Sequence, residues 1–160
     1  MDLLFSNDRR GQYPESWYAA TATPLEPFPP LGGQTKADVC IIGAGFTGLS
    51  AALHLAEAGA EVVLLDAHRV GFGASGRNGG QLGSGQRQEQ KAREKMVGED
   101  AARRLWDLGE DAKSLVRQLV ERYKIDCYLK DGIAWAASHA SDVNDLHAYA
   151  EHLQTRYGYE

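Results

Sequence analysis

Residues 39–66 read VCIIGAGFTGLSAALHLAEAGAEVVLLD, and no other part of the chain says as much about its structure. An apolar run enters a glycine turn of the pattern G-x-G-x-x-G, an amphipathic segment follows, and a second apolar run stops at Asp66. This order predicts a strand over 39–42, a helix that ends near Gly59, and a second strand over 62–65. Such a glycine pattern is weak evidence alone, but here it has both strands and an acid about 20 residues further on. We therefore expect a Rossmann-like α/β fold whose β-α-β unit binds an adenine dinucleotide.

The three glycines of the turn have separate roles. Gly43 allows the chain to leave the strand in a tight turn, Gly45 lets the backbone approach a pyrophosphate, and Gly48 lets the helix pack closely on the sheet. The pyrophosphate would lie at the helix N-terminus, where unpaired N–H groups favour negative charge. Asp66 could accept hydrogen bonds from ribose hydroxyls and would repel a 2′-phosphate. The alternative is a β-α-β unit with an ordinary glycine turn.

Length, charge and cysteine content restrict the class of protein. The chain of 160 residues is long enough for one domain with a hydrophobic core, and its net charge of −5 argues against nucleic-acid binding. No apolar run reaches the roughly 18 residues of a membrane span, and residues 1–10 are too polar for a signal peptide. We expect Cys40 and Cys127 to be buried, reduced thiols, because they lack metal-ligand spacing. A cytoplasmic protein without a metal fits these features.

Residues 1–36 differ in composition from the rest of the chain. All five prolines lie here, and Gly32 and Gly33 close the segment, which predicts an extended N-terminal arm. Because the arm also contains Tyr13, Trp17, Tyr18 and Phe28, we expect it to pack across a globular body. A partly disordered tail is the alternative.

Further elements are predicted beyond the β-α-β unit. Apolar residues at spacings of three and four predict a long packing helix over about 99–123. Residues 125–129 and 133–137 are strand candidates joined by a turn at Asp131-Gly132. A final helix is expected after Ser141-Asp142.

A glycine-rich loop over 67–85 follows the second predicted strand. A flexible connector would explain the glycines, but it would not explain why Arg77 and Asn78 lie between them. A loop that brings backbone N–H groups, an arginine and an asparagine toward a cofactor explains the composition better.

Residues 38–81 resemble the D-amino-acid/glycine oxidase family of FAD-dependent oxidoreductases. Members of that family follow the acid of the second strand with a loop of the type G-x-G-A-S, which is GFGAS at residues 71–75 here. The resemblance extends to SWYAAT at 16–21 and RYKIDC at 122–127, and so covers nearly all of the chain from about Tyr13 onward.

The resemblance implies FAD as the cofactor. Asp66 matches the acidic residue that binds the ribose, a position where the family more often has glutamate. Arg69 lies where the family has a residue near the adenosine half of FAD. Residues 75–81 match the segment that passes along the flavin. Asn78 stands near the point where some relatives have a histidine that bonds to the flavin, so non-covalent FAD is expected. The residues expected to contact the cofactor are Gly43, Ala44, Gly45, Phe46, Thr47, Gly48, Asp66, Ala67, Arg69, Gly73, Ala74, Ser75, Arg77, Asn78, Gly79, Gly80 and Gln81.

The chemistry implied by the resemblance is oxidation of a C–N bond of an amine or amino acid. The resulting imine would hydrolyse to an aldehyde, and oxygen would be reduced to hydrogen peroxide. An NAD-dependent dehydrogenase, against which the 71–81 loop argues, and a non-catalytic nucleotide-binding fragment are the alternatives. No catalytic residue is assigned, because the five histidines are scattered and lack a positioned partner.

The predicted organisation has three parts: the arm over 1–36, an FAD-binding Rossmann-like region over 37–124, and the start of a second, α+β substrate domain over 125–160. Family members are much longer than this chain, so we expect it to be the N-terminal portion of a flavoenzyme that lacks most of the substrate pocket. The exact substrate, the electron acceptor and the oligomeric state stay open.

Overall fold

The computed structural model describes residues 6, 8–23 and 25–160. It divides into two compact units, residues 1–80 and 81–160. The first unit contains the only strands of the described residues, and the second is built from helices. The domain boundaries expected near residues 36 and 124 stay predictions.

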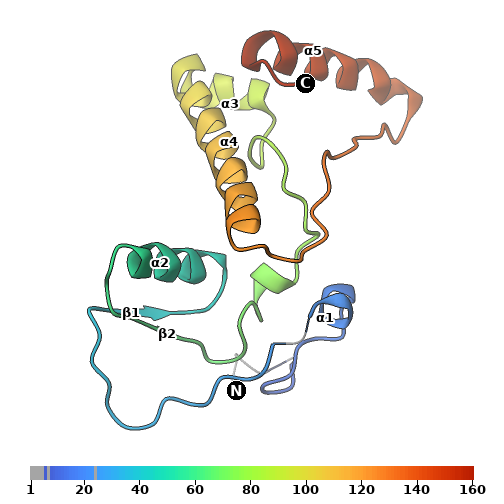
Figure 1. Ribbon diagram of the computed structural model, residues 1–160. Helices are drawn as coiled ribbons and strands as arrows, with labels where there is room; N and C mark the ends of the chain where they lie inside the picture. The colour runs from blue at the N-terminus through green and yellow to red at the C-terminus, as the bar shows by residue number, and fades with distance from the viewer. Residues whose placement is uncertain (1–5, 7, 24) are drawn as a thin grey trace. The chain divides into compact units, whose positions relative to one another are not determined.

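The first unit is organised around a parallel β-α-β unit. It consists of β1 (Val39–Ile42), α2 (Phe46–Glu57) and β2 (Val62–Leu65), as the sequence predicts. The two strands pair in parallel, with Val39 opposite Val62 and Ile42 opposite Leu65. Helix α2 lies along one face of this two-stranded sheet (Figure 1).

The opposite face of β1 is exposed, which corrects the expectation of a buried Cys40. Successive side chains of a strand point to opposite faces. Ile41 faces α2, since its Cγ2 atom would lie 3.3 Å from a Cβ added at Gly48. Cys40 and Ile42 therefore point away from the helix, and Ile42 is 78% exposed. Cys127 is also exposed, in a segment that forms no strand, so its predicted burial is wrong too.

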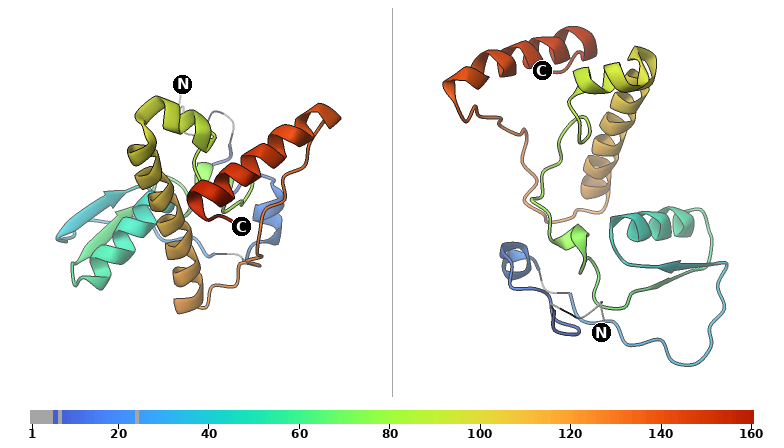
Figure 2. Two further views of the ribbon diagram at one scale, coloured as in Figure 1. Left: turned by 90° about the horizontal axis from the view of Figure 1, so that it is seen from above. Right: turned by 180° about the vertical axis from the view of Figure 1, so that it is seen from behind.

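The arm contains one short helix, α1 (Trp17–Thr21), where the sequence predicts only extended chain. The helix forms because Ser16 caps it, accepting a hydrogen bond at Oγ from the Ala19 N–H over 3.2 Å. Residues 25–37 then run without helix or strand toward β1 (Figure 2). The expected packing of the arm is only partly seen: the Tyr13 hydroxyl donates to the Val70 carbonyl over 2.7 Å, whereas Trp17 and Phe28 are 76% and 72% exposed.

The second unit is formed by α3 (Gln90–Val97), α4 (Glu99–Arg122) and α5 (Val143–Tyr157). The predictions of α4 and α5 are confirmed, whereas α3 is not predicted, because its sequence QKAREKMV has little apolar periodicity. Trp106 of α4 is buried and contacts Tyr157 of α5, with 5.0 Å between the ring centroids. Helix α3 packs beside the N-terminal part of α4, and the C-terminal end of α5 reaches the same region (Figures 1 and 2).

The two strands predicted over 125–129 and 133–137 do not form. Residues 123–138 contain neither helix nor strand, and Ile125, Leu129 and Ile133 are each more than 40% exposed. The Asp131-Gly132 turn does bend the chain, with φ +80° at Gly132. A hairpin of two strands buries too little apolar surface to be stable by itself, and no third strand of the described residues pairs with it.

A buried polar network joins the three helices of the second unit. The Gln90 side chain, in a residue only 1% exposed, donates to the Ala102 carbonyl over 2.8 Å and to the Tyr157 hydroxyl over 3.0 Å. The Tyr157 hydroxyl in turn donates to Glu94 Oε1 over 2.6 Å, and His152 Nε2 lies 2.9 Å from the same oxygen.

The network shifts the titration of two of its members. Burial acts to raise the pKa of Glu94, but the bonds from Tyr157 and His152 outweigh burial, and the pKa is lowered. Burial, together with the bond to Glu94, raises the pKa of Tyr157. Both shifts favour the protonation states in which the network is complete at neutral pH.

Candidate functional site

The glycine turn between β1 and α2 can be made only by glycine at two of its positions. Gly43 has φ +101°, in the left-handed region, and its N–H donates to the Leu65 carbonyl over 2.7 Å. A Cβ added at Gly48 would lie 1.9 Å from the Gly43 carbonyl oxygen. The turn therefore brings the first residue of the pattern directly against the helix, as the packing role predicted for Gly48 requires.

The N-terminus of α2 has the properties of an anion site. Gly45 provides no side-chain cap, and the first turn contains no acidic residue. Phe46 and Thr47 are exposed there, and the Phe46 N–H donates to Ser75 Oγ over 3.0 Å. The hydroxyl accepts a hydrogen bond from one N–H of the first turn and keeps its own O–H to donate to an anion bound at this helix N-terminus.

Both oxygens of the Asp66 carboxylate accept hydrogen bonds from backbone N–H groups. Oδ2 accepts a hydrogen bond from the Ala44 N–H over 2.7 Å, and Oδ1 accepts one from the His68 N–H over 2.7 Å. The carboxylate thus joins the end of β2 to the glycine turn. Each oxygen keeps a second lone pair for a further donor such as a ribose hydroxyl, and Asp66 and Ala67 are exposed.

Asn78 binds the backbone of the loop after β2 in which it lies. Asn78 Nδ2 donates to the carbonyls of Ala74 and Ser75, and Asn78 Oδ1 accepts from the Gly80 N–H over 2.9 Å. The short 3-10 helix Ala74–Gly76 fits closely, because a Cβ at Gly76 would lie 2.2 Å from the Gly71 carbonyl oxygen.

The two basic side chains of this segment are engaged within the first unit. The Arg77 guanidinium lies 4.6 Å from the Phe72 ring centroid and 3.1 Å from a carboxylate oxygen of Asp8. Arg69 donates to the Gly11 carbonyl over 3.3 Å and to the Leu25 carbonyl, both in the arm. Their predicted contacts with a cofactor stay predictions.

The structure gathers most of the expected residues, but not all of them. The turn 43–48, Asp66 and Ser75 are joined directly by the two bonds to Ala44 and Phe46. Gly73, Ala74, Gly79 and Gly80 belong to the same unit, whereas Gln81 is the first residue of the second unit.

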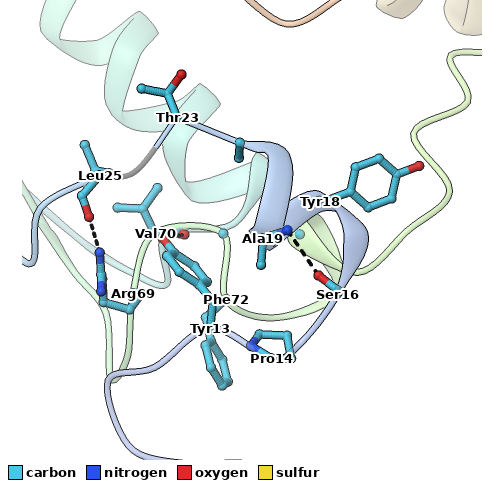
Figure 3. A pocket seen from close by; sticks show the side chains of 13 residues that line it. Tyr13, Pro14, Ser16, Tyr18, Ala19, Thr23, Leu25, Arg69, Val70 and Phe72 are labelled. Carbon is cyan, nitrogen blue, oxygen red and sulfur yellow. Dashed lines mark hydrogen bonds between the residues drawn. The ribbon is translucent and has the colours of Figure 1, made fainter.

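A pocket of about 360 Å³ lies between the arm and the loop after β2, and no pattern in the sequence predicts it. Figure 3 shows Tyr13 and Arg69 on its wall, with α1 on the other side. The only signal in the sequence is the pair of tyrosines in an otherwise proline-rich arm.

The described ranges show neither a cluster of metal-ligating side chains nor a membrane-spanning helix. No group of three or more histidine, cysteine, aspartate or glutamate side chains could hold a metal ion there. In the same part of the chain, no helix combines the length and apolar character that a membrane crossing requires.

A parallel β-α-β unit with this turn and this acid defines a dinucleotide-binding protein of the Rossmann-like α/β class. The comparisons with known proteins specify the cofactor. The family model described as FAD dependent oxidoreductase matches residues 38–160, so the chain belongs to this FAD-dependent oxidoreductase family. The resemblance found in the sequence is thereby confirmed.

Several curated relatives are similar over most of this chain. Gamma-glutamylputrescine oxidoreductase of Escherichia coli is 42% identical over 147 residues, which cover 92% of this chain and 34% of the relative. The probable oxidoreductase OrdL of Rhizobium meliloti is 45% identical over 90% of this chain and 34% of its own length. OrdL of Haemophilus influenzae is 44% identical over 83% of this chain and 31% of its own length. The chain thus spans about a third of the length of these relatives, and comparison with solved structures gave no significant match.

Proposed function

We propose that the first unit holds FAD non-covalently, with the pyrophosphate at the N-terminus of α2. The observation that carries this proposal is the exposed, acid-free start of that helix, with Ser75 Oγ already hydrogen-bonded to the Phe46 N–H. The close contact of Gly48 with Gly43 supports it, because any side chain there would fill the space that the turn needs. Asp66 would hold the ribose with its remaining lone pairs.

The proposed reaction is oxidation of a C–N bond of an amine or amino acid. The substrate would give an imine that hydrolyses to an aldehyde, with oxygen as the electron acceptor and hydrogen peroxide as the product. When bound, FAD supplies the acceptor for the hydride from the carbon next to the substrate nitrogen. The residues of this chain would bind and orient it. The similarity to gamma-glutamylputrescine oxidoreductase supports an amine as the substrate.

Two further parts of the proposal rest on the same family. Residues 125–160 would be the start of a substrate domain, and the protein would act in the cytoplasm on a small molecule. The absence of strands over 125–137 means that the sheet of such a domain would need strands from elsewhere.

The experiment is turnover by the protein encoded by the complete gene that contains this sequence. The protein is loaded with FAD and incubated with gamma-glutamylputrescine, putrescine, glycine, sarcosine and a set of D-amino acids, and peroxide is measured. We expect one of these amines to bleach the flavin absorbance without oxygen and to give peroxide with oxygen. A protein that binds FAD but is reduced by none of them would contradict the amine chemistry.

A further inference from the structure

The N-terminal arm is hydrogen-bonded to the glycine-rich loop at points spread along both segments. The Tyr13 hydroxyl donates to the Val70 carbonyl over 2.7 Å, and the Tyr18 hydroxyl donates to the Gly79 carbonyl over 2.6 Å. The Asp8–Arg77 ion pair adds a third connection, with 3.1 Å between the charged atoms. These contacts reach the start and the end of the loop, and the residues they join are 57 to 61 positions apart for the two tyrosines.

Arg69 holds the arm on both sides of α1. Its guanidinium donates to the Gly11 carbonyl before the helix and to the Leu25 carbonyl after it. The same group lies 4.8 Å from the centroid of the Tyr13 ring. Figure 3 shows Arg69 and Tyr13 next to each other, with the Leu25 bond drawn. The arm is thus bound, before and after α1, to a single side chain at the start of the loop.

Tyr18 contacts the loop beside a glycine in the left-handed region. Gly80 has φ +72°, and a Cβ added there would lie 3.2 Å from the Tyr18 hydroxyl oxygen. The hydrogen bond to Gly79 therefore orients the peptide that precedes a left-handed glycine. Glycine-rich backbone has many accessible conformations, and each external contact removes some of them.

We propose that the arm, through Asp8, Tyr13 and Tyr18, positions the loop 69–80, with Tyr18 as the main positioning residue. The arm keeps the loop in the conformation that presents Ser75 Oγ to the N-terminus of α2. This inference rests on the proposed binding of FAD at that terminus, and it assigns the arm a part in cofactor affinity. Tyr18 acts through the loop, and no direct contact between Tyr18 and the cofactor is involved.

The test compares Tyr18→Phe with a control, Tyr128→Phe, in the purified protein. Each substitution removes one hydroxyl, but Tyr128 is 85% exposed and lies in the other unit. Limited trypsin cleavage between Arg77 and Asn78, followed by mass spectrometry, reports opening of the loop. FAD titration reports the effect on cofactor affinity. Asp8→Asn is the second variant, since it breaks the ion pair with Arg77 at another point of the same arm.

We expect Tyr18→Phe to raise the cleavage rate about fivefold and to weaken FAD binding by a similar factor. A change of about fivefold corresponds to the net contribution of one hydrogen bond. Asp8→Asn should act in the same direction with a smaller factor, and Tyr128→Phe should change neither quantity. Unchanged FAD affinity in Tyr18→Phe, with or without faster cleavage, would overturn the inference while leaving the proposed FAD site intact. A parent protein that binds no FAD would overturn the proposed function itself.

Discussion

The carboxylate of Asp66 accepts a hydrogen bond from the Ala44 N–H, with 2.7 Å between Oδ2 and the nitrogen. The residue that ends β2 is therefore bonded to the turn that follows β1. A glutamate at this position would be one methylene longer, and the shorter aspartate still reaches the turn. The acid thus has a structural role in addition to the ribose contact proposed for it.

Replacing Asp66 by Asn tests both roles. The amide keeps one acceptor oxygen, so either the Ala44 or the His68 N–H faces an NH₂ group, and we expect a loss of about 1–2 kcal/mol in the free energy of unfolding. FAD affinity should fall at least about tenfold, which corresponds to a loss of about 1.4 kcal/mol in the free energy of binding. Urea unfolding and FAD titration measure the two effects. Asp107→Asn, which changes an exposed carboxylate in α4, is the control.

Gly48→Ala should be one of the most damaging single substitutions in the first unit. The new Cβ would lie 1.9 Å from the Gly43 carbonyl oxygen, so the helix must move away from the turn. We expect destabilisation of about 3 kcal/mol, the upper end of overpacking costs, together with loss of FAD binding. In Gly109→Ala the nearest neighbour of the new Cβ lies 3.4 Å away. That substitution in α4 should be neutral or stabilising, because alanine favours a helix.

The β-α-β unit that contains Gly48 and Asp66 shows what could be predicted from the sequence. The pattern around residues 39–66 predicts β1, α2, β2 and the acid, because local periodicity and glycine chemistry determine a β-α-β unit. The bond from Phe46 to Ser75 and the arm contacts of Arg69 could not be predicted, since they join residues far apart through loop conformation. The strands predicted over 125–137 fail for a related reason, because a strand needs a partner that local sequence does not supply.

Acid should weaken the second unit through Glu94. Its pKa is lowered from the ordinary value of 4.5, so the ionised carboxylate stabilises the fold. This contribution is fully present above pH 4.5 and is lost as the pH falls through the lowered pKa. The difference in unfolding free energy between the parent and Glu94→Gln should therefore be largest near neutral pH and shrink below pH 4.5. The exposed Glu151→Gln serves as control, and a difference that does not depend on pH would contradict the assignment.

The cofactor should be released by acid denaturation. Asn78 uses its side-chain amide within the loop, and an amide cannot form the bond to flavin that a histidine forms in some relatives. After precipitation with trichloroacetic acid, we expect all yellow colour in the supernatant. Flavin that stays with the precipitated protein would show a covalent link at some other residue.

Titration of the purified protein with FAD, with NAD as the competitor, tests the central claim most directly. Our account predicts saturable FAD binding with a flavin absorbance in the visible region, no displacement by NAD, and loss of binding in Gly48→Ala. A colourless protein that binds NAD, or an FAD affinity unchanged in Gly48→Ala, would contradict it.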